Sequence, residues 1–316
     1  MTSSLQQRRP LPQLADDVFL TDGGIETTLI YHHGLDLPEF AAFVLLDDER
    51  GREELRRYFR PYLELAASTG TGIVLETPTW RANPDWGQVL GYSPEALAAA
   101  NRAAVALLEE LRQEHESPEH PVVISGCLGP RGDGYAPESL MTAEQAEDYH
   151  GVQIGTFAQT SADVVTAITM THTGEAIGVA RAAAAHGVPS VISFTVETDG
   201  RLPSGETLGE AVRATDEATD AAPAYYMVNC AHPTHVDSTL LEGQGWNHRI
   251  RGLRANASTM SHAELEAAES LDIGDIDDFG ARYAALHASL PHISVLGGCC
   301  GTDVRHIEAV RQQVTG

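Results

Sequence analysis

The feature that most constrains the fold is an alternation of eight short apolar segments with longer amphipathic ones. The apolar segments are rich in β-branched residues and lack the polar alternation of a half-exposed sheet, which is typical of parallel strands buried on both faces. We expect them to form strands at residues 18–22, 72–77, 122–127, 163–170, 190–196, 225–230, 249–255 and 293–297.

A segment with apolar residues at helical spacing follows each predicted strand. These helices are expected at residues 53–69, 93–115, 142–160, 174–186, 207–219, 233–241, 276–290 and 303–314. Eight strand–helix units predict a single α/β domain over residues 1–316, a (β/α)8 TIM barrel, with residues 1–16 as a flexible N-terminal extension. A doubly wound open sheet is the alternative that the pattern does not exclude, although its glycine-rich phosphate fingerprint is missing.

Charge and composition exclude several classes of partner. The formal net charge of −25 at pH 7 argues against binding to nucleic acid or to an anionic membrane surface. No apolar run approaches the roughly 20 residues of a membrane-spanning helix, and the N-terminus lacks the apolar core of a secretion signal. Four cysteines in 316 residues are too few for a disulfide scaffold. We therefore expect a cytoplasmic protein that acts on small molecules, and a homo-oligomer remains open.

Three of the four cysteines end predicted strands. Cys230 ends the sixth strand, and Cys299 and Cys300 end the eighth. Active sites of α/β barrels lie at the C-terminal ends of the strands, so these sulfurs are expected to converge on one metal ion. Glycines on both sides of the Cys-Cys pair permit a sharp backbone turn, which would let both side chains face that ion. Three thiolates leave the fourth position of tetrahedral zinc open, as a catalytic site requires.

Residue chemistry alone leaves a second interpretation of the cysteines open. Free cysteine is commonly a small buried apolar residue, and a Cys-Cys pair can be oxidised or incidental. The short Cys-x-x-Cys spacing of structural zinc modules is absent. Cys127, inside the third predicted strand, is interpreted as barrel packing.

Motifs along the chain resemble those of the homocysteine S-methyltransferase family. The resemblance runs in order from about residue 19 to residue 306, and it is carried by Asp22-Gly23-Gly24, Ser193-Phe194-Thr195, Val228-Asn229-Cys230 and Gly297-Gly298-Cys299-Cys300-Gly301-Thr302. The resemblance implies a zinc ion held by Cys230, Cys299 and Cys300, with the acceptor thiol at the fourth position. It also implies transfer of a methyl group from a sulfonium or quaternary ammonium donor to that thiol, with homocysteine giving methionine.

The same resemblance suggests substrate contacts. Asp22 and the backbone of Gly23 would hold the amino acid part of the acceptor, and Asn229 would support its zinc-bound end. Thr79 falls in a segment that lines the pocket in relatives. Trp80 would face a methylated cation, since aromatic faces attract such groups, with a packed loop aromatic as the alternative.

One departure from the family concerns the acceptor. Relatives that use homocysteine often carry a glutamate at the end of the fourth strand, where this chain has Ile168. We expect that another acid compensates (Glu26, Glu76 and Glu197 are the candidates) or that the acceptor is a different thiol. A non-catalytic barrel that senses zinc or thiols is a second alternative. A hydrolase that uses zinc-bound water ranks last, because an all-thiolate site donates too much charge to make that water strongly acidic. Betaine, S-methylmethionine and S-adenosylmethionine all stay open as methyl donors.

Overall fold

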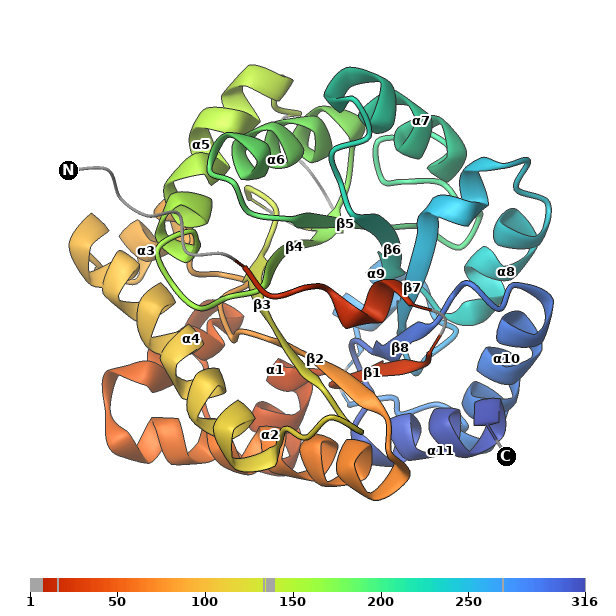
Figure 1. Cartoon of the computed structure of the whole chain (residues 1–316), viewed down its shortest axis with the longest axis horizontal. Helices are drawn as coiled ribbons and strands as arrows, with labels where there is room; N and C mark the ends of the chain where they lie inside the picture. The colour runs from red at the N-terminus through yellow and green to blue at the C-terminus, as the bar shows by residue number, and fades with distance from the viewer. Residues whose placement is uncertain (1–7, 16, 133, 135–139, 269, 316) are drawn as a thin grey trace.

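Eight parallel strands close into one ring in chain order, which confirms the predicted (β/α)8 barrel (Figure 1). The computed structural model of the chain describes residues 8–15, 17–132, 134, 140–268 and 270–315. The strands are β1 (Phe19–Thr21), β2 (Gly72–Glu76), β3 (Val122–Leu128), β4 (Val164–Met170), β5 (Ser190–Thr195), β6 (Tyr225–Asn229), β7 (Ile250–Ala255) and β8 (Val295–Gly298).

One principal helix follows each strand and lies outside the ring (Figure 1). These are α2 (Glu49–Thr69), α4 (Pro94–His115), α5 (Ala143–Phe157), α6 (Thr173–Ala185), α7 (Leu208–Thr219), α8 (Pro233–Leu241), α10 (Ile276–Ser289) and α11 (Val304–Thr315). Among the described residues, no helix combines the length and the apolar character needed to cross a membrane.

Short helical segments interrupt the loops, and most are too short to show a helical period in the sequence. They are α1 (Ile25–Thr27), α3 (Pro84–Val89) and α9 (His262–Glu266), the π-turn η2 (Thr28–His32), and the 3₁₀ turns η1 (Pro12–Leu14), η3 (Pro38–Phe40), η4 (Ala42–Asp47) and η5 (Trp246–Arg249). The first two lie after β1 and β2, and α9 lies after β7, so they belong to the loops at the C-terminal ends of the strands.

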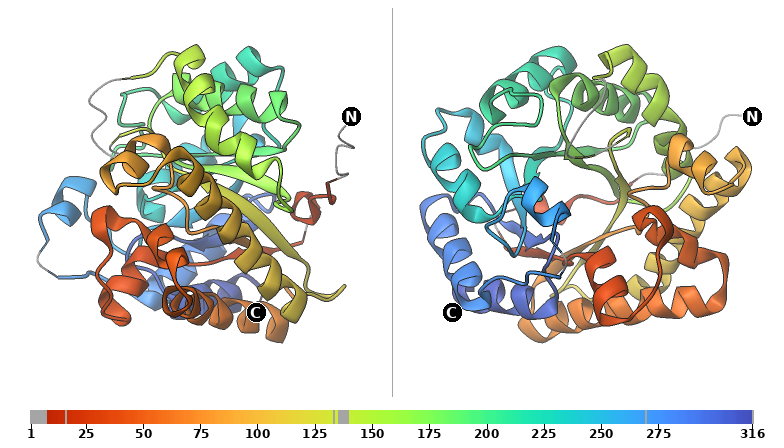
Figure 2. Two further views of the ribbon diagram at one scale, coloured as in Figure 1. Left: turned by 90° about the vertical axis from the view of Figure 1, so that its left-hand side faces the viewer. Right: turned by 180° about the vertical axis from the view of Figure 1, so that it is seen from behind.

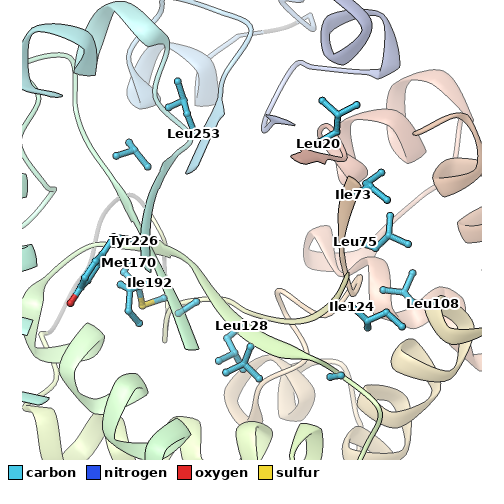
Figure 3. Close-up of a cluster of buried hydrophobic side chains, with 14 of the residues drawn as sticks. Leu20, Ile73, Leu75, Leu108, Ile124, Leu128, Met170, Ile192, Tyr226 and Leu253 are labelled. Atoms are coloured by element: carbon cyan, nitrogen blue, oxygen red, sulfur yellow. The ribbon is translucent and has the colours of Figure 1, made fainter. Parts of the chain in front are cut away.

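The strands are apolar on both faces because each face is buried. Outward-facing residues such as Leu20, Ile73 and Leu253 pack against the surrounding helices (Figure 3). Inward-facing residues form a separate cluster inside the ring, which includes Val74 and Val191. Burial of apolar side chains stabilises the fold by about 25 cal/mol per Å² removed from water, so both faces contribute.

Hydroxyl side chains at the helix starts explain why the sequence located those starts well. Ser93 accepts a hydrogen bond from the backbone N–H of Ala96 at the start of α4. Thr142 and Thr207 each form a capping box with the residue three positions later, at the starts of α5 and α7. Such caps satisfy backbone N–H groups that a helix leaves unpaired and stabilise it by about 1 kcal/mol.

Residues 8–15 cross the end of the barrel at which the strands begin (Figure 1). Gln13 is fully buried there, and the guanidinium group of Arg8 donates a hydrogen bond of 3.0 Å to the carbonyl of Ala158. Part of the segment expected to be a flexible extension, residues 8–15, therefore contacts the barrel. Residues 1–7 and 16 lie outside the described part of the chain.

Candidate metal centre

Three sulfur atoms meet at the C-terminal mouth of the barrel. The Sγ atoms of Cys230, Cys299 and Cys300 all lie within 4.8 Å of one another. Within the described ranges, no other group of three or more His, Cys, Asp or Glu side chains comes together in this way. A tetrahedral zinc ion with Zn–S bonds of about 2.3 Å places its sulfur ligands about 3.8 Å apart. The three cysteines therefore fit a zinc ion, and they come from two separate strand ends, as the sequence predicted.

The backbone turns sharply at Cys230, immediately after β6. Its φ angle is +53°, in the left-handed region that non-glycine residues seldom adopt. Its N–H donates to the carbonyl of Arg254 at 3.1 Å, which continues the ladder between β6 and β7. Its carbonyl accepts hydrogen bonds from Asn256 Nδ2 at 3.0 Å and from His262 Nε2 at 2.6 Å. The residue that supplies the first sulfur is thus held on both sides of its peptide unit.

The glycines around Cys299 and Cys300 have two different roles. Of Gly297, Gly298 and Gly301, only Gly301 has a positive φ, of +79°. Gly297 and Gly298 lie in β8, where a Cβ would stand 1.8 Å from Thr21 Oγ1 and 2.1 Å from Thr302 Oγ1, respectively. The sequence interpretation that all three permit a turn therefore needs correction: Gly297 and Gly298 permit close packing, and Gly301 permits the turn.

The Cys230 sulfur opposes ionisation of the other two cysteines. The Cys230 sulfur, hydrogen-bonded to both neighbours, raises the pKa of the Cys299 and Cys300 thiols. Burial adds to the shift, because removal from water disfavours a thiolate. A divalent cation between the sulfurs would reverse both effects, since a coordinating thiol loses its proton.

A buried ion cluster lies beside the sulfurs. Arg254 Nη2 donates to Asp22 Oδ1 at 2.8 Å, and Arg254 Nη1 lies 3.9 Å from Glu76 Oε1. Arg254 Nε also donates to the carbonyl of Gly298 at 3.2 Å, directly before Cys299. Burial alone would lower the pKa of Arg254, but the Asp22 and Glu76 carboxylates outweigh it and raise the pKa. The arginine therefore ties the ends of β1, β2, β7 and β8 together under the site.

Glu76 makes the stability of the protein depend on pH. Burial raises the pKa of its carboxyl to about 7 from an ordinary value of 4.5. The folded chain then binds this proton more tightly than the unfolded chain does, so the free energy of unfolding falls as pH rises from about 4.5 to about 7 and levels off above that. In the variant Glu76→Gln this part of the slope is expected to vanish, as urea denaturation at pH 5, 6, 7 and 8 would measure. Equal slopes in wild type and variant would contradict the assignment.

The predicted acceptor-binding residues already have partners inside the protein. Asp22 Oδ2 accepts from the Tyr58 hydroxyl at 2.9 Å, and its Oδ1 accepts from Arg254. The Tyr58 hydroxyl also lies 2.9 Å from the carbonyl of Gly23. Burial is the main cause that raises the pKa of Asp22. A substrate ammonium at Asp22 would therefore share this carboxylate with Arg254.

Asn229 fixes an irregular point in β4. Its Oδ1 accepts from the backbone N–H of Thr169 at 2.9 Å and from the Ser193 hydroxyl at 2.7 Å, and its Nδ2 donates to Thr169 Oγ1 at 2.9 Å. Thr169 has φ +69°, and the pairing of β4 with β5 shifts register there. The amide of Asn229 thus sets the backbone that directly follows Ile168, and Ile168 itself is buried among the inward-facing residues.

Thr79 and Trp80, in the loop after β2, form hydrogen bonds to β3 and β4, respectively. Thr79 is fully buried, and its hydroxyl donates to the carbonyl of Cys127 at 2.8 Å. The indole N–H of Trp80 donates to the carbonyl of Ile168 at 3.3 Å. The guanidinium carbon of Arg81 lies 4.4 Å from the centroid of the Trp80 ring, over one of its faces. A cation–π contact of Trp80 with a donor would have to use the opposite face.

The three candidate carboxylates differ in what already neutralises them. Glu197 contacts His262 Nδ1 at 3.1 Å, and Glu76 faces Arg254. Glu26, in α1, forms no close ion pair among the described residues, and the guanidinium of Arg81 acts on it only through a longer-range attraction that lowers its pKa. Burial, Asp22 and Cys230 raise its pKa to about 7, which places its carboxylate within electrostatic reach of the sulfur cluster. Glu26 is the candidate left open toward a ligand.

Sequence reasoning missed three residues of the site. Arg254 could have been found from the sequence, because it is a charged residue in an apolar strand. It also occupies one of the alternate positions of β7 that face the inside of the barrel. Tyr58 and His262 carry none, since they come from α2 and α9 and reach the site only through the tertiary fold.

Comparisons with known proteins agree with this architecture. The family model described as homocysteine S-methyltransferase matches residues 19–314. The chain is 23% identical to a selenocysteine Se-methyltransferase of Brassica oleracea var. italica over 93% of its own length and 88% of the relative's. It is 21% identical to homocysteine S-methyltransferase 2 of Arabidopsis thaliana over 93% and 92% of the two lengths.

A solved structure shows the same fold. The metallated form of the homocysteine methyltransferase MmuM from Escherichia coli superposes with a TM-score of 0.72 at 17% identity, covering 94% of this chain and 96% of that one. The family match spans nearly the whole barrel and includes both cysteine-bearing strand ends. The chain therefore belongs to the homocysteine S-methyltransferase family, and it is an S-methyltransferase.

Proposed function

We propose that the protein is a zinc-dependent thiol S-methyltransferase that moves a methyl group from a sulfonium or quaternary ammonium donor to homocysteine, giving methionine. The observation that carries this proposal is the convergence of three sulfurs from the ends of β6 and β8 at the barrel mouth. Three thiolate ligands leave one tetrahedral position for a substrate. The family match supplies the reaction class.

Cys230, Cys299 and Cys300, which stand at the ends of β6 and β8, would hold the zinc ion. Zinc, when bound, lowers the pKa of a coordinated thiol so that the thiol is a thiolate at neutral pH. As whole residues, Cys300 is exposed and Cys299 is partly exposed, so the cluster lies at the solvent side of the mouth although the thiol groups themselves are largely removed from water. The acceptor would approach from this side.

The reaction needs positioning more than acid–base chemistry. The acceptor thiolate attacks the donor's methyl carbon, a carbon–sulfur bond forms, and the bond from that carbon to the onium atom breaks with its electron pair going to that atom. The thiol proton has left for solvent before the transfer, and the donor becomes neutral. Side chains that align the two substrates therefore supply the rate enhancement.

The charge around the mouth suits a cationic donor. Asp22 and Glu76 share the guanidinium of Arg254, while the guanidinium of Arg81 acts on Glu26, so three carboxylates stand against two arginines. Clefts lined with one sign of charge concentrate ligands of the opposite sign. The carboxylates would thus attract an onium group to the side of the barrel where the sulfurs lie.

For the acceptor, we assign the ammonium group of homocysteine to Glu26. Ile168 is buried and apolar, and it offers no charge at the end of β4. Glu76 and Glu197 already contact Arg254 and His262. Glu26 stands in the segment that follows Asp22-Gly23, and the neighbouring Thr27 hydroxyl accepts a 3.2 Å hydrogen bond from the N–H of Gly301 beside the cysteine pair. This contact keeps the segment beside the sulfurs.

The variant Glu26→Gln tests the ammonium assignment. A charge-assisted hydrogen bond contributes about 1.5–3 kcal/mol, so we expect kcat/KM for homocysteine to fall about 10- to 100-fold. The same variant should methylate 4-mercaptobutanoate, which lacks the ammonium, about as well as wild type does. Steady-state rates with both thiols measure this discrimination.

Glu64 provides a matched control, because it is an exposed glutamate on the outer helix α2. Glu64→Gln should leave both rates unchanged. Glu26→Gln with an unchanged preference for homocysteine would refute the ammonium assignment. A wild-type preference for 4-mercaptobutanoate over homocysteine would instead identify the altered acceptor pocket.

A further inference from the structure

The conformation of Cys230 needs support from outside its own strand. A non-glycine residue in the left-handed region costs roughly 1–2 kcal/mol, because its Cβ crowds the following carbonyl oxygen. Such residues persist where surrounding contacts over-determine them. At Cys230 the φ of +53° directs the chain away from the line of β6, so the position of its sulfur depends on what fixes this turn.

Two side chains fix the turn by donating hydrogen bonds to the Cys230 carbonyl oxygen. Asn256 Nδ2 reaches it at 3.0 Å from directly after β7. His262 Nε2 reaches it at 2.6 Å from the first residue of α9. The other ring nitrogen of His262 lies 3.1 Å from Glu197 Oε1, on the loop that follows β5. The imidazole is therefore held from both sides, with 10% of its side chain exposed.

Helix α9 brings this histidine over the barrel mouth. Seen from behind in Figure 2, the short helix lies in front of the ring on the side opposite the N-terminal segment. The Ser261 side chain caps α9 and forms a capping box with Glu264, which fixes the direction in which the helix starts. The loop after β7 thus carries a side chain that reaches back to the residue after β6.

We propose that His262, oriented by Glu197, is a positioning residue that holds the Cys230 peptide in its left-handed conformation and so sets where the Cys230 sulfur lies relative to Cys299 and Cys300. The proposal rests on the metal site of the proposed function. If it is right, His262 determines metal affinity although its side chain is not one of the three sulfur ligands. Partners of this kind around metal ligands typically alter affinity by about 10- to 100-fold when removed.

The direct test is metal binding by the full-length variant His262→Ala. Competition with a chromophoric chelator measures zinc affinity, and we expect it to weaken about 10- to 100-fold. Replacement of zinc by Co²⁺ gives thiolate-to-metal absorption bands that report the ligand geometry. These bands should shift or broaden in the variant, which a general loss of stability would not cause in the folded fraction.

Two conservative variants test whether the hydrogen bond from His262 to the Cys230 carbonyl is responsible for the zinc affinity. His262→Gln keeps a side-chain N–H that can donate to the Cys230 carbonyl, and it should recover most of the zinc affinity. Glu197→Gln keeps an acceptor oxygen for the imidazole, so it should lose less affinity than His262→Ala does. Recovery by glutamine but not alanine would tie the effect to the donated hydrogen bond.

His235 is the matched control. Its Nε2 donates at 3.0 Å to the carbonyl of Thr259, in the same loop after β7, without touching a cysteine. His235→Ala should therefore keep wild-type zinc affinity and cobalt bands, while circular dichroism confirms that all variants are folded. Equal weakening in His235→Ala and His262→Ala would overturn the proposal, because it would show that loop stability alone is responsible.

Failure of the positioning role can be distinguished from failure of the metal site. A wild-type protein that binds zinc tightly, together with a His262→Ala variant of the same affinity and cobalt spectrum, would overturn the positioning role and leave the proposed function intact. A wild-type protein that binds neither zinc nor cobalt would overturn the metal site itself, and the positioning role with it.

Discussion

Replacing Cys299 with serine is expected to remove bound zinc and methyl transfer together. A serine hydroxyl is a much weaker ligand for zinc than a thiolate, and only two sulfurs would remain in the cluster. We expect less than about a tenth of the wild-type zinc content, since structural and catalytic zinc sites depend on the full ligand set. Metal analysis of the purified variant and a methyl-transfer assay with homocysteine measure the two losses.

Cys127 supplies the control for this experiment. It is a buried cysteine of β3, inside the barrel and outside the sulfur cluster. Cys127→Ser should keep stoichiometric zinc. Cys299→Ser with full zinc and full transfer would contradict the proposed site. Loss of zinc from Cys299→Ser with methyl transfer unchanged would contradict the zinc dependence of the reaction.

Replacing Arg254 with methionine is expected to destabilise the fold by about 3–5 kcal/mol. The reason is that removal of one partner from a buried ion pair leaves the other charge uncompensated. Here Asp22 would lose its 2.8 Å contact and Glu76 its nearby cation. Urea denaturation of wild type and variant at pH 7 measures the change in the free energy of unfolding.

A double variant separates the lost charge from lost packing. Asp22→Asn in the Arg254→Met background should recover part of the stability, because the uncompensated carboxylate is then gone. Arg251→Met is the control on the same strand, where the guanidinium donates to the carbonyl of Ala15 at the surface. A loss below about 0.5 kcal/mol in Arg254→Met would contradict the cluster's role, since that is the range of ordinary surface changes.

The fold was predictable because its signals are local. A parallel strand buried on both faces reads as an unbroken apolar run, and several helix starts carry a capping residue such as Ser93 or Thr142. The short helix α9 was not predictable, because five residues are too few to show a period. Its capping box, Ser261 with Glu264, was the only local signal.

The site was predictable only where residues end strands. Cys230, Cys299 and Cys300 stand at the ends of β6 and β8, and barrel closure brings such positions together without further information. Arg254 and His262 act through partners that are distant in sequence, Asp22 at a separation of 232 residues and Cys230 at 32. A single sequence does not encode these pairings as a local pattern. For that reason the ion pair between Arg254 and Asp22 was not predicted.

X-ray absorption at the zinc edge, on the purified protein with and without homocysteine, probes the three-sulfur site most directly. We expect three Zn–S bonds at about 2.3 Å and one lighter ligand in the free protein, changing to four Zn–S bonds when the thiol is added. A protein without zinc, or a zinc ion whose sulfur count stays the same on adding homocysteine, would contradict a site built to hold an acceptor thiol.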